Sequence, residues 1–183
     1  MNLVLIGYRG TGKSAIARRL GKLLSMQAIS LDEEIVREAG QSIQELVAAS
    51  GWVHFRDIEE GICRKFGERD GLVIDCGGGV VEREANFHSL RKGGHVYWLR
   101  ATPTTIVARI GGDKSRPSLT GSKSFTEEVQ EVLARREPLY QRLAHDSIDT
   151  DGRDVDDLAG SIAVRFRTTV KDMSVGTREG GQA

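Results

Sequence analysis

Short apolar runs alternate with longer amphipathic stretches along this chain. Runs at residues 3–6, 72–74 and 95–99 are mostly apolar, which is typical of strands buried on both faces of a sheet. Two weaker runs, at residues 28–30 and 147–149, fit the same alternation. The pattern therefore predicts five short strands with helices between them.

The intervening stretches have helical spacing and helix-start signals. In residues 13–24 the apolar side chains recur at Ile16, Ala17, Leu20 and Leu24, which places them on one helical face. Further helices are predicted at residues 43–49, 53–67, 104–110, 125–144 and 155–167. Their start signals are two capping boxes, two single N-caps and a first-turn proline: Ser42 with Glu45, Ser124 with Glu127, Thr102, Asp154 and Pro103.

Strands that alternate with helices predict an α/β fold, a three-layer sandwich around a mostly parallel sheet. In such folds ligands bind beyond the carboxyl ends of the strands. Residues 7–14, Asp32, residues 77–79 and residues 109–117 all follow predicted strands, so we expect them to meet at one edge of the sheet. Residues 1–170 form one domain in this interpretation, and the polar residues 171–183 are predicted to be a disordered tail.

Composition narrows the class of protein. The 183 residues include 26 basic and 26 acidic side chains, so nothing indicates nucleic acid or an anionic membrane as partner. The apolar start is too short for a signal sequence, which favours the cytoplasm. Cys63 and Cys76 have no paired spacing and are interpreted as reduced core thiols, and the four histidines lack metal-ligand spacing.

The strongest motif is the segment at residues 7–14, which matches G-x-x-x-x-G-K-[ST]. Its glycines let the backbone wrap closely around a phosphate, and the following helix N-terminus favours an anion. In this motif Lys13 reaches the β- and γ-phosphates, and Ser14 places its hydroxyl on Mg²⁺. The motif predicts ATP as the bound nucleotide and Mg²⁺ as its metal.

Three further features have both a functional and a structural interpretation. Asp32 is placed to meet an acceptor hydroxyl, or it is the N-cap of a helix that begins at Glu33. Arg56 is an anion-binding side chain, or it forms a surface ion pair with Glu59 one turn later. The triple glycine at residues 77–79 is a backbone cradle for a ligand, or it is a plain turn.

A polar, glycine-containing loop follows the helix that ends near Arg109. Residues 111–124 have the composition of a mobile lid, in which Arg116 would contact phosphates on closing. Arg135 and Arg136 lie together on the next helix, and one of the two is interpreted as a surface residue. Asp75 ends a predicted strand and is a candidate for Mg²⁺ through water, or it caps the following turn or pairs with an arginine.

These ordered pieces resemble the shikimate kinase family over approximately residues 2–167. The resemblance rests on the phosphate loop, Asp32 with Ile35, Phe55-Arg56 with Glu59, the triple glycine, Arg116-Pro117, and Arg136 with Pro138-Leu139-Tyr140. It implies a fold like that of nucleoside monophosphate kinases, with a five-stranded parallel sheet, a mobile lid and a substrate-binding helical segment at about residues 32–60. It also implies transfer of the ATP γ-phosphate to the 3-hydroxyl of shikimate, in chorismate biosynthesis, by a monomer.

The resemblance assigns roles to individual residues. Catalysis is assigned to Lys13, Asp32 and Arg116. Acceptor binding is assigned to Asp32, Arg56, Gly77, Gly78, Gly79 and Arg136. The predicted nucleotide-binding set is Gly10, Thr11, Gly12, Lys13, Ser14, Ala15, Arg109, Arg116 and Arg153. The metal set is Ser14, from the phosphate-loop motif, with Asp75, from its position at the end of a predicted strand.

One position departs from the family pattern. Ser30 stands where the family usually has the first aspartate of D-x-D, near Mg²⁺. The remaining alternatives are a kinase for gluconate or a nucleoside monophosphate, or a nucleotide-binding regulator that has lost catalysis, which only Ser30 suggests. A GTP-dependent switch is disfavoured because the chain contains no N-K-x-D tetrad.

Overall fold

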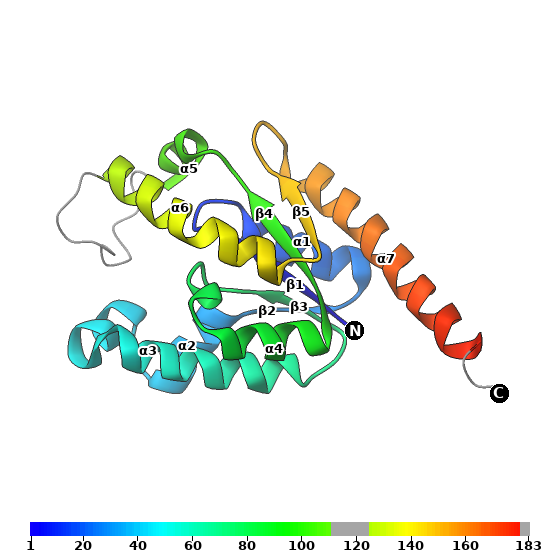
Figure 1. The fold of residues 1–183 in the computed structure, drawn as a ribbon, viewed down its shortest axis with the longest axis horizontal. Helices are drawn as coiled ribbons and strands as arrows, with labels where there is room; N and C mark the ends of the chain where they lie inside the picture. Colours follow the sequence, from blue (N-terminus) through cyan, green and yellow to red (C-terminus); the bar gives the residue numbers. More distant parts are fainter. Residues whose placement is uncertain (111–124, 180–183) are drawn as a thin grey trace.

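The computed structural model describes residues 1–110 and 125–179 of the chain, with a five-stranded parallel sheet at the centre (Figure 1). The strands are β1 (Asn2–Ile6), β2 (Gln27–Ser30), β3 (Leu72–Asp75), β4 (Gly94–Arg100) and β5 (Asp146–Asp149). The helices are α1 (Lys13–Leu24), α2 (Leu31–Ala39), α3 (Ile43–Gly67), the 3-10 turn η1 (Val80–Glu82), α4 (Glu84–Lys92), α5 (Pro103–Ile110), α6 (Phe125–Leu143) and α7 (Val155–Glu179). The predicted three-layer α/β architecture is confirmed.

The strand order β2-β3-β1-β4-β5 places β1 in the middle of the sheet. All four pairings are parallel, so every carboxyl end lies at the same edge. The register aligns Leu5 of β1 with Asp75 of β3, and Asp75 with Ser30 of β2. The segments that follow β1, β2 and β3 therefore begin side by side at this edge, as the alternation of strands and helices predicted.

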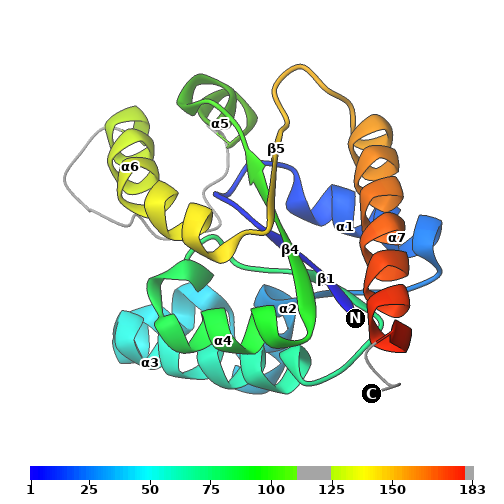
Figure 2. The same ribbon diagram turned by 45° about the vertical axis from the view of Figure 1, so that its right-hand side comes forward.

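Two apolar clusters hold the layers together because β1 is buried on both faces. Val4 and Ile6 belong to the cluster that β1 shares with α3, α4 and α6, whereas Leu3 and Leu5 belong to the cluster formed with α1 and α7. Figure 2 shows α1 and α7 together on one side of the sheet and α3 and α4 on the other. None of the described helices is both long enough and apolar enough to cross a membrane.

Most predicted helix starts are confirmed by their hydrogen bonds. Ser42 and Glu45 form the reciprocal capping box, Thr102 Oγ1 accepts from the amide of Thr105, and Asp154 caps α7. The box predicted at Ser124 lies outside the described residues.

The two helices predicted on either side of residue 51 are present as the two arms of α3. They meet at Gly51, whose φ of 77° and ψ of 170° lie outside the helical region. Two other element predictions were wrong. Helix α4 was not predicted because its inward face carries a polar residue, Asn86, whose amide donates to the Val80 carbonyl at 2.8 Å. Its start also lacks a side-chain cap.

The predicted disordered tail is also wrong over residues 171–179, because α7 continues to Glu179. Sparse apolar content led to that prediction. A helix already fixed by packing extends at little cost, since each added residue makes one backbone hydrogen bond. Residues 180–183 lie outside the described part of the chain.

Candidate active site

The phosphate loop connects β1 to α1 and depends on glycine at positive φ. Gly10 and Gly12 have φ of 82° and 89°, a region that side-chain-bearing residues rarely occupy. At Gly7, a Cβ would lie 2.4 Å from the carbonyl oxygen of Leu99 on the neighbouring strand. The loop therefore has the backbone path that the motif predicted.

Lys13 and the start of α1 provide the loop's positive potential. The Lys13 Nζ donates to the Tyr8 carbonyl at 2.9 Å, which holds the ammonium across the loop, and the residue is only 7% exposed. The first turn of α1 contains no acidic residue to offset the helix dipole. Ser14 is exposed in that turn, so its hydroxyl is accessible beside the anion site.

Asp32 lies in the first turn of α2 but is not its N-cap. The cap is Ser30, whose hydroxyl accepts from the Glu33 amide at 3.4 Å. The structural alternative for Asp32 is therefore wrong, and its carboxylate lines a pocket instead.

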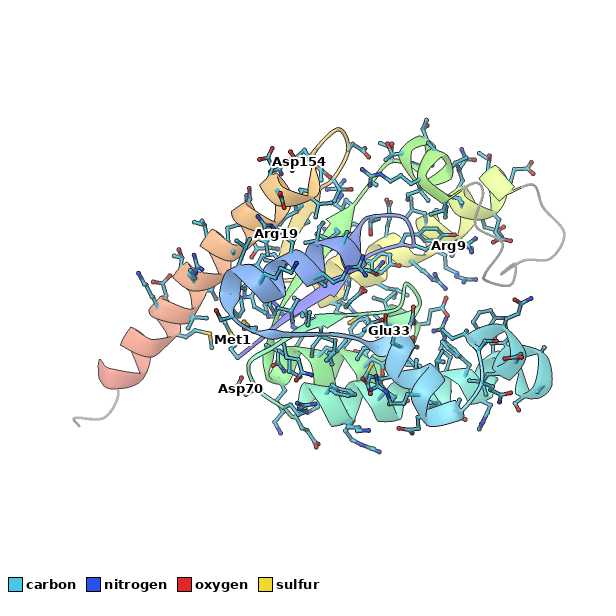
Figure 3. The ribbon with its side chains drawn as sticks, turned by 180° about the vertical axis from the view of Figure 1, so that it is seen from behind. Met1, Arg9, Arg19, Glu33, Asp70 and Asp154 are labelled. Carbon is cyan, nitrogen blue, oxygen red and sulfur yellow. The ribbon has the colours of Figure 1, made fainter. Side chains whose placement is uncertain are left out.

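That pocket adjoins the phosphate loop and is lined by residues from five segments of the chain. Tyr8 and Arg9 of the loop form part of its wall. Arg9 also donates to Glu128 of α6 at 3.2 Å, and Figure 3 shows it lying beside that helix. The pocket contains all six residues predicted to bind the acceptor, together with four others that the sequence did not single out for binding: Asp32, Arg56, Gly77, Gly78, Gly79 and Arg136, with Ile43, Trp52, Phe55 and Glu59.

Two buried arginines in this pocket converge on one carboxylate, that of Glu82 in η1. Arg56 Nη2 donates to Glu82 Oε2 at 2.8 Å, and Arg136 Nε donates to Glu82 Oε1 at 2.9 Å. Arg56 and Arg136 are only 9% and 4% exposed, so both are largely removed from water. The pair shows that guanidiniums from α3 and α6 can hold a carboxylate together, a geometry that suits bidentate recognition.

Arg56 is held on its other side by Glu59 and two aromatic rings. Its Nη1 donates to Glu59 Oε2 at 2.7 Å, and its Cζ lies 5.0 Å from the Phe55 ring centroid and 5.6 Å from that of Trp52. Cation–π contact of this kind stabilises a partly desolvated guanidinium. The sequence paired Arg56 with Glu59 but gave no signal for Trp52.

Glu59 is 1% exposed, and burial raises the pKa of its carboxyl to about 7. The Arg56 guanidinium lowers this pKa, whereas the charges of Asp32 and Glu82 raise it further. Because the ordinary pKa is near 4.5, the folded protein binds the Glu59 proton more tightly than the unfolded chain does.

The free energy of unfolding should therefore fall as the pH rises from 4.5 to about 7, the interval between the unfolded and folded pKa. The Glu59→Gln variant lacks this titration. Relative to that variant, the wild type should lose up to about 3 kcal/mol across the interval and then stay level. Urea denaturation of both proteins from pH 4.5 to 8 measures the difference. Parallel stability curves would contradict the assignment of this proton to Glu59.

Two glycines of the triple make room for side chains of the pocket. A Cβ at Gly77 would lie 2.6 Å from Asp32 Oδ1, and one at Gly79 would lie 2.0 Å from Arg56 Nη2, whereas one at Gly78 would make only an ordinary contact, 3.4 Å from the Arg9 amide nitrogen. The segment is therefore not a plain turn, since it lets two pocket side chains approach its backbone. Tyr140, which the resemblance included, donates to the Gly78 carbonyl and fixes the segment against α6.

The predicted nucleotide-binding residues beyond the loop are only partly brought together. Arg109 donates to the Gly10 carbonyl at 3.2 Å and to the Thr150 carbonyl at 2.9 Å, so it joins the phosphate loop to the segment after β5. Arg153 is exposed and donates to Ser161 of α7 at 3.2 Å, and Ala15, in the first turn of α1, lines a surface groove that α1 shares with the start of α7. Arg116 and the predicted lid at residues 111–124 lie outside the described residues.

The predicted metal residues lie at the carboxyl edge of the sheet. Asp75 is 6% exposed at the end of β3, beside the strand that leads into the phosphate loop. It is also in register with Ser30 of β2, and the Ser30 hydroxyl is engaged in capping α2. A buried carboxylate and the exposed hydroxyl of Ser14 are oxygen donors of the kind that suits Mg²⁺.

Comparisons with known proteins agree with this geometry. The family profile described as shikimate kinase matches residues 9–167 of the chain. The chain is 43% identical over 161 residues to the shikimate kinase of Rhodopirellula baltica, with 86% of each sequence covered. It is 36% identical over 165 residues to the shikimate kinase of Thermodesulfovibrio yellowstonii, covering 90% of this chain and 94% of that protein.

A solved structure gives the same result. The shikimate kinase from Acinetobacter baumannii in complex with shikimate superposes with a TM-score of 0.87 at 30% identity. The match covers 92% of this chain and 93% of the other.

Proposed function

The chain belongs to the shikimate kinase family, and from that premise we propose that it transfers the γ-phosphoryl group of ATP to the 3-hydroxyl of shikimate. The products are shikimate 3-phosphate and ADP, in the biosynthesis of chorismate. The observation that carries the proposal is the convergence of Arg56 and Arg136 on a carboxylate beside the phosphate loop. A small carboxylate polyol is the acceptor that this pocket suits.

Arg56 and Arg136 bind the shikimate carboxylate in this proposal, with the backbone of Gly78 and Gly79 alongside. Two guanidiniums match a carboxylate by forked, charge-assisted hydrogen bonds. Asp32, in the same pocket, accepts hydrogen bonds from the ring hydroxyls and orients the 3-hydroxyl toward the phosphate loop.

Phosphoryl transfer then proceeds by in-line displacement. The oxygen of the 3-hydroxyl forms the new bond to the γ-phosphorus, the bond to the β–γ bridging oxygen breaks, and Asp32 takes the hydroxyl proton. Lys13 and Arg116 offset the negative charge on the transferring group, and Gly10, Thr11 and Gly12 direct backbone groups at the phosphates. Ala15, Arg109 and Arg153 complete the proposed nucleotide set.

Mg²⁺ is the proposed metal, held by Ser14 and, through water, by Asp75. When bound, it neutralises charge on the phosphate oxygens. The acidic side chain at Asp75 and the hydroxyl at Ser14 fit this role, since Mg²⁺ keeps several waters and needs few protein ligands.

We further propose that residues 111–124 form a lid over a helical substrate-binding segment at about residues 32–60. The protein acts as a cytoplasmic monomer in this proposal, without a nucleic-acid or membrane partner. The balanced charge supports the absence of a nucleic-acid or anionic-membrane partner.

Gly79→Ala tests the carboxylate site. The φ of Gly79 is −97°, which alanine accepts, so the added methyl should displace the Arg56 guanidinium rather than strain the backbone. Loss of one charge-assisted contact of about 1.5–3 kcal/mol should raise the KM for shikimate roughly ten- to a hundredfold. The KM for ATP should change little.

Gly61→Ala is the matched control for this substitution. Gly61 lies on the same helix as Arg56, and a Cβ there meets nothing within 4 Å. It should leave both KM values unchanged and stabilise the helix slightly. A Gly79→Ala enzyme with a normal KM for shikimate would contradict the placement of Arg56 at the carboxylate.

The function itself is tested with the purified wild type, MgATP and a panel of acceptors. Shikimate should give ADP and shikimate 3-phosphate, identified by mass and ³¹P NMR, whereas gluconate and AMP should not be phosphorylated at comparable rates. Preferential turnover of gluconate or AMP would establish another kinase activity. ATP binding without phosphorylation of any of the three would favour the regulator.

A further inference from the structure

Glu82 is the centre of an ion-pair cluster that joins three elements around the pocket. Its Oε2 accepts from Arg56 of α3, and its Oε1 accepts from both Arg135 and Arg136 of α6. The distances are 2.8 Å to Arg56 Nη2, 3.0 Å to Arg135 Nη2, and 2.9 and 2.8 Å to Arg136 Nε and Nη2. One side chain from η1 therefore ties α3 to α6.

Glu82 could either fill the acceptor pocket or support the arginines from beside it, and its position decides between these roles. Arg56 and Arg136 both line the pocket, whereas the Glu82 side chain does not form part of its wall. Each guanidinium has five N–H donors, and Glu82 accepts from one on Arg56 and two on Arg136. The contact therefore lies beside the pocket and does not fill it.

The two buried guanidiniums need a neighbouring negative charge. Two guanidiniums that are 9% and 4% exposed repel one another unless an anion lies between them. Although burial alone would raise it, the neighbouring Arg136 and Arg56 hold the pKa of the Glu82 carboxyl below its usual value. Glu82 consequently stays ionised at neutral pH.

We infer that Glu82 is a positioning residue for the acceptor site: it holds Arg56 and Arg136 in a convergent orientation before the substrate carboxylate arrives. The inference rests on the proposed function, because it concerns the same arginines. Without Glu82, Arg56 would keep its contacts with Glu59 and the two aromatic rings, but shikimate would have to bring the two guanidiniums into their convergent orientation as it binds.

The size of the effect follows from that ordering. Immobilising one rotamer-rich side chain lowers affinity by roughly two- to tenfold, and two such side chains are involved here. Removing a nearby negative charge acts in the opposite direction, because it lessens repulsion of the substrate carboxylate. We expect Glu82→Ala to raise the KM for shikimate about three- to thirtyfold, with kcat and the KM for ATP nearly unchanged.

The experiment compares the wild type with Glu82→Ala and Glu82→Gln, with Glu84→Gln as the matched control. Glu84 is an exposed carboxylate two residues away that pairs with Arg142 on the surface, so its loss reproduces the change in net charge. Glu82→Gln retains an acceptor oxygen and should have an intermediate KM. Thermal melting of each variant establishes that the fold is intact.

The KM for shikimate in the presence of formate distinguishes a positioning role from a change in stability alone. In Glu82→Ala, formate can fill the vacated carboxylate position and restore the convergent orientation of Arg56 and Arg136. The KM for shikimate should therefore fall toward the wild-type value. The same additions to the wild type measure any direct competition by formate at the acceptor site.

The outcomes are distinguishable. An unchanged or lowered KM in Glu82→Ala, or a KM that formate only raises, would overturn the positioning role while the wild-type activity upheld the proposed function. A wild type that does not phosphorylate shikimate would overturn both. A raised KM that formate lowers would support the inference.

Discussion

Replacing Asp32 by asparagine should lower kcat with shikimate by about 10²- to 10⁴-fold, the usual contribution of a positioned acid–base group. The amide has nearly the same shape as the carboxylate, so it should still fit beside Gly77 in the pocket wall. It cannot accept the proton of the 3-hydroxyl, and it orients that hydroxyl less strongly because it carries no charge. The KM for ATP should stay within a few-fold of the wild type.

Glu33→Gln is the control for this substitution. Glu33 is the next residue of α2, is exposed, and donates its amide to the same Ser30 cap. It should have normal kcat, which would show that loss of an acid from the first turn is not itself harmful. Wild-type kcat in Asp32→Asn would exclude Asp32 from the chemical step, whereas a change only in the KM for shikimate would limit it to binding.

Replacing Lys13 by methionine should lower kcat by about 10²- to 10³-fold, the range for losing one preorganised group that stabilises transition-state charge. The ammonium is held over the phosphate loop by the Tyr8 carbonyl, so little reorganisation is needed when ATP arrives. Methionine fills a similar volume without the charge. Steady-state kinetics with saturating shikimate measure the loss, and single-turnover experiments separate chemistry from product release.

Lys22→Met is the matched control, because Lys22 is exposed in the last turn of the same helix. It should have wild-type kcat. Urea denaturation checks stability, since Lys13→Met also loses the hydrogen bond to Tyr8. If kcat is unchanged and only the KM for ATP rises, Lys13 contributes equally to ground-state and transition-state binding, contrary to the proposed mechanism.

The sequence by itself determined the parts of this protein that depend on local chemistry. The phosphate loop was recognisable because its function requires glycine, lysine and serine at fixed spacing, and Gly10 and Gly12 indeed have positive φ. The five strands followed from apolar runs, since strands of a parallel sheet are buried on both faces. The acceptor residues came from the resemblance to the shikimate kinase family, and all six line one pocket.

Other features depended on contacts between distant segments. The sequence left Asp32 open between a helix cap and a functional acid, and the capping hydrogen bond of Ser30 excluded the helix cap. The inward Asn86 of α4 likewise depends on packing, which periodicity does not record.

Glu82 is the clearest case of a residue that only the tertiary structure identified. In sequence it is one of 26 acidic residues, within a polar stretch after the triple glycine. Its partners Arg56 and Arg136 lie 26 and 54 residues away along the chain. Only packing of α3, η1 and α6 brings the three charges within hydrogen-bonding distance, because an ion pair between distant segments leaves no local pattern in the sequence.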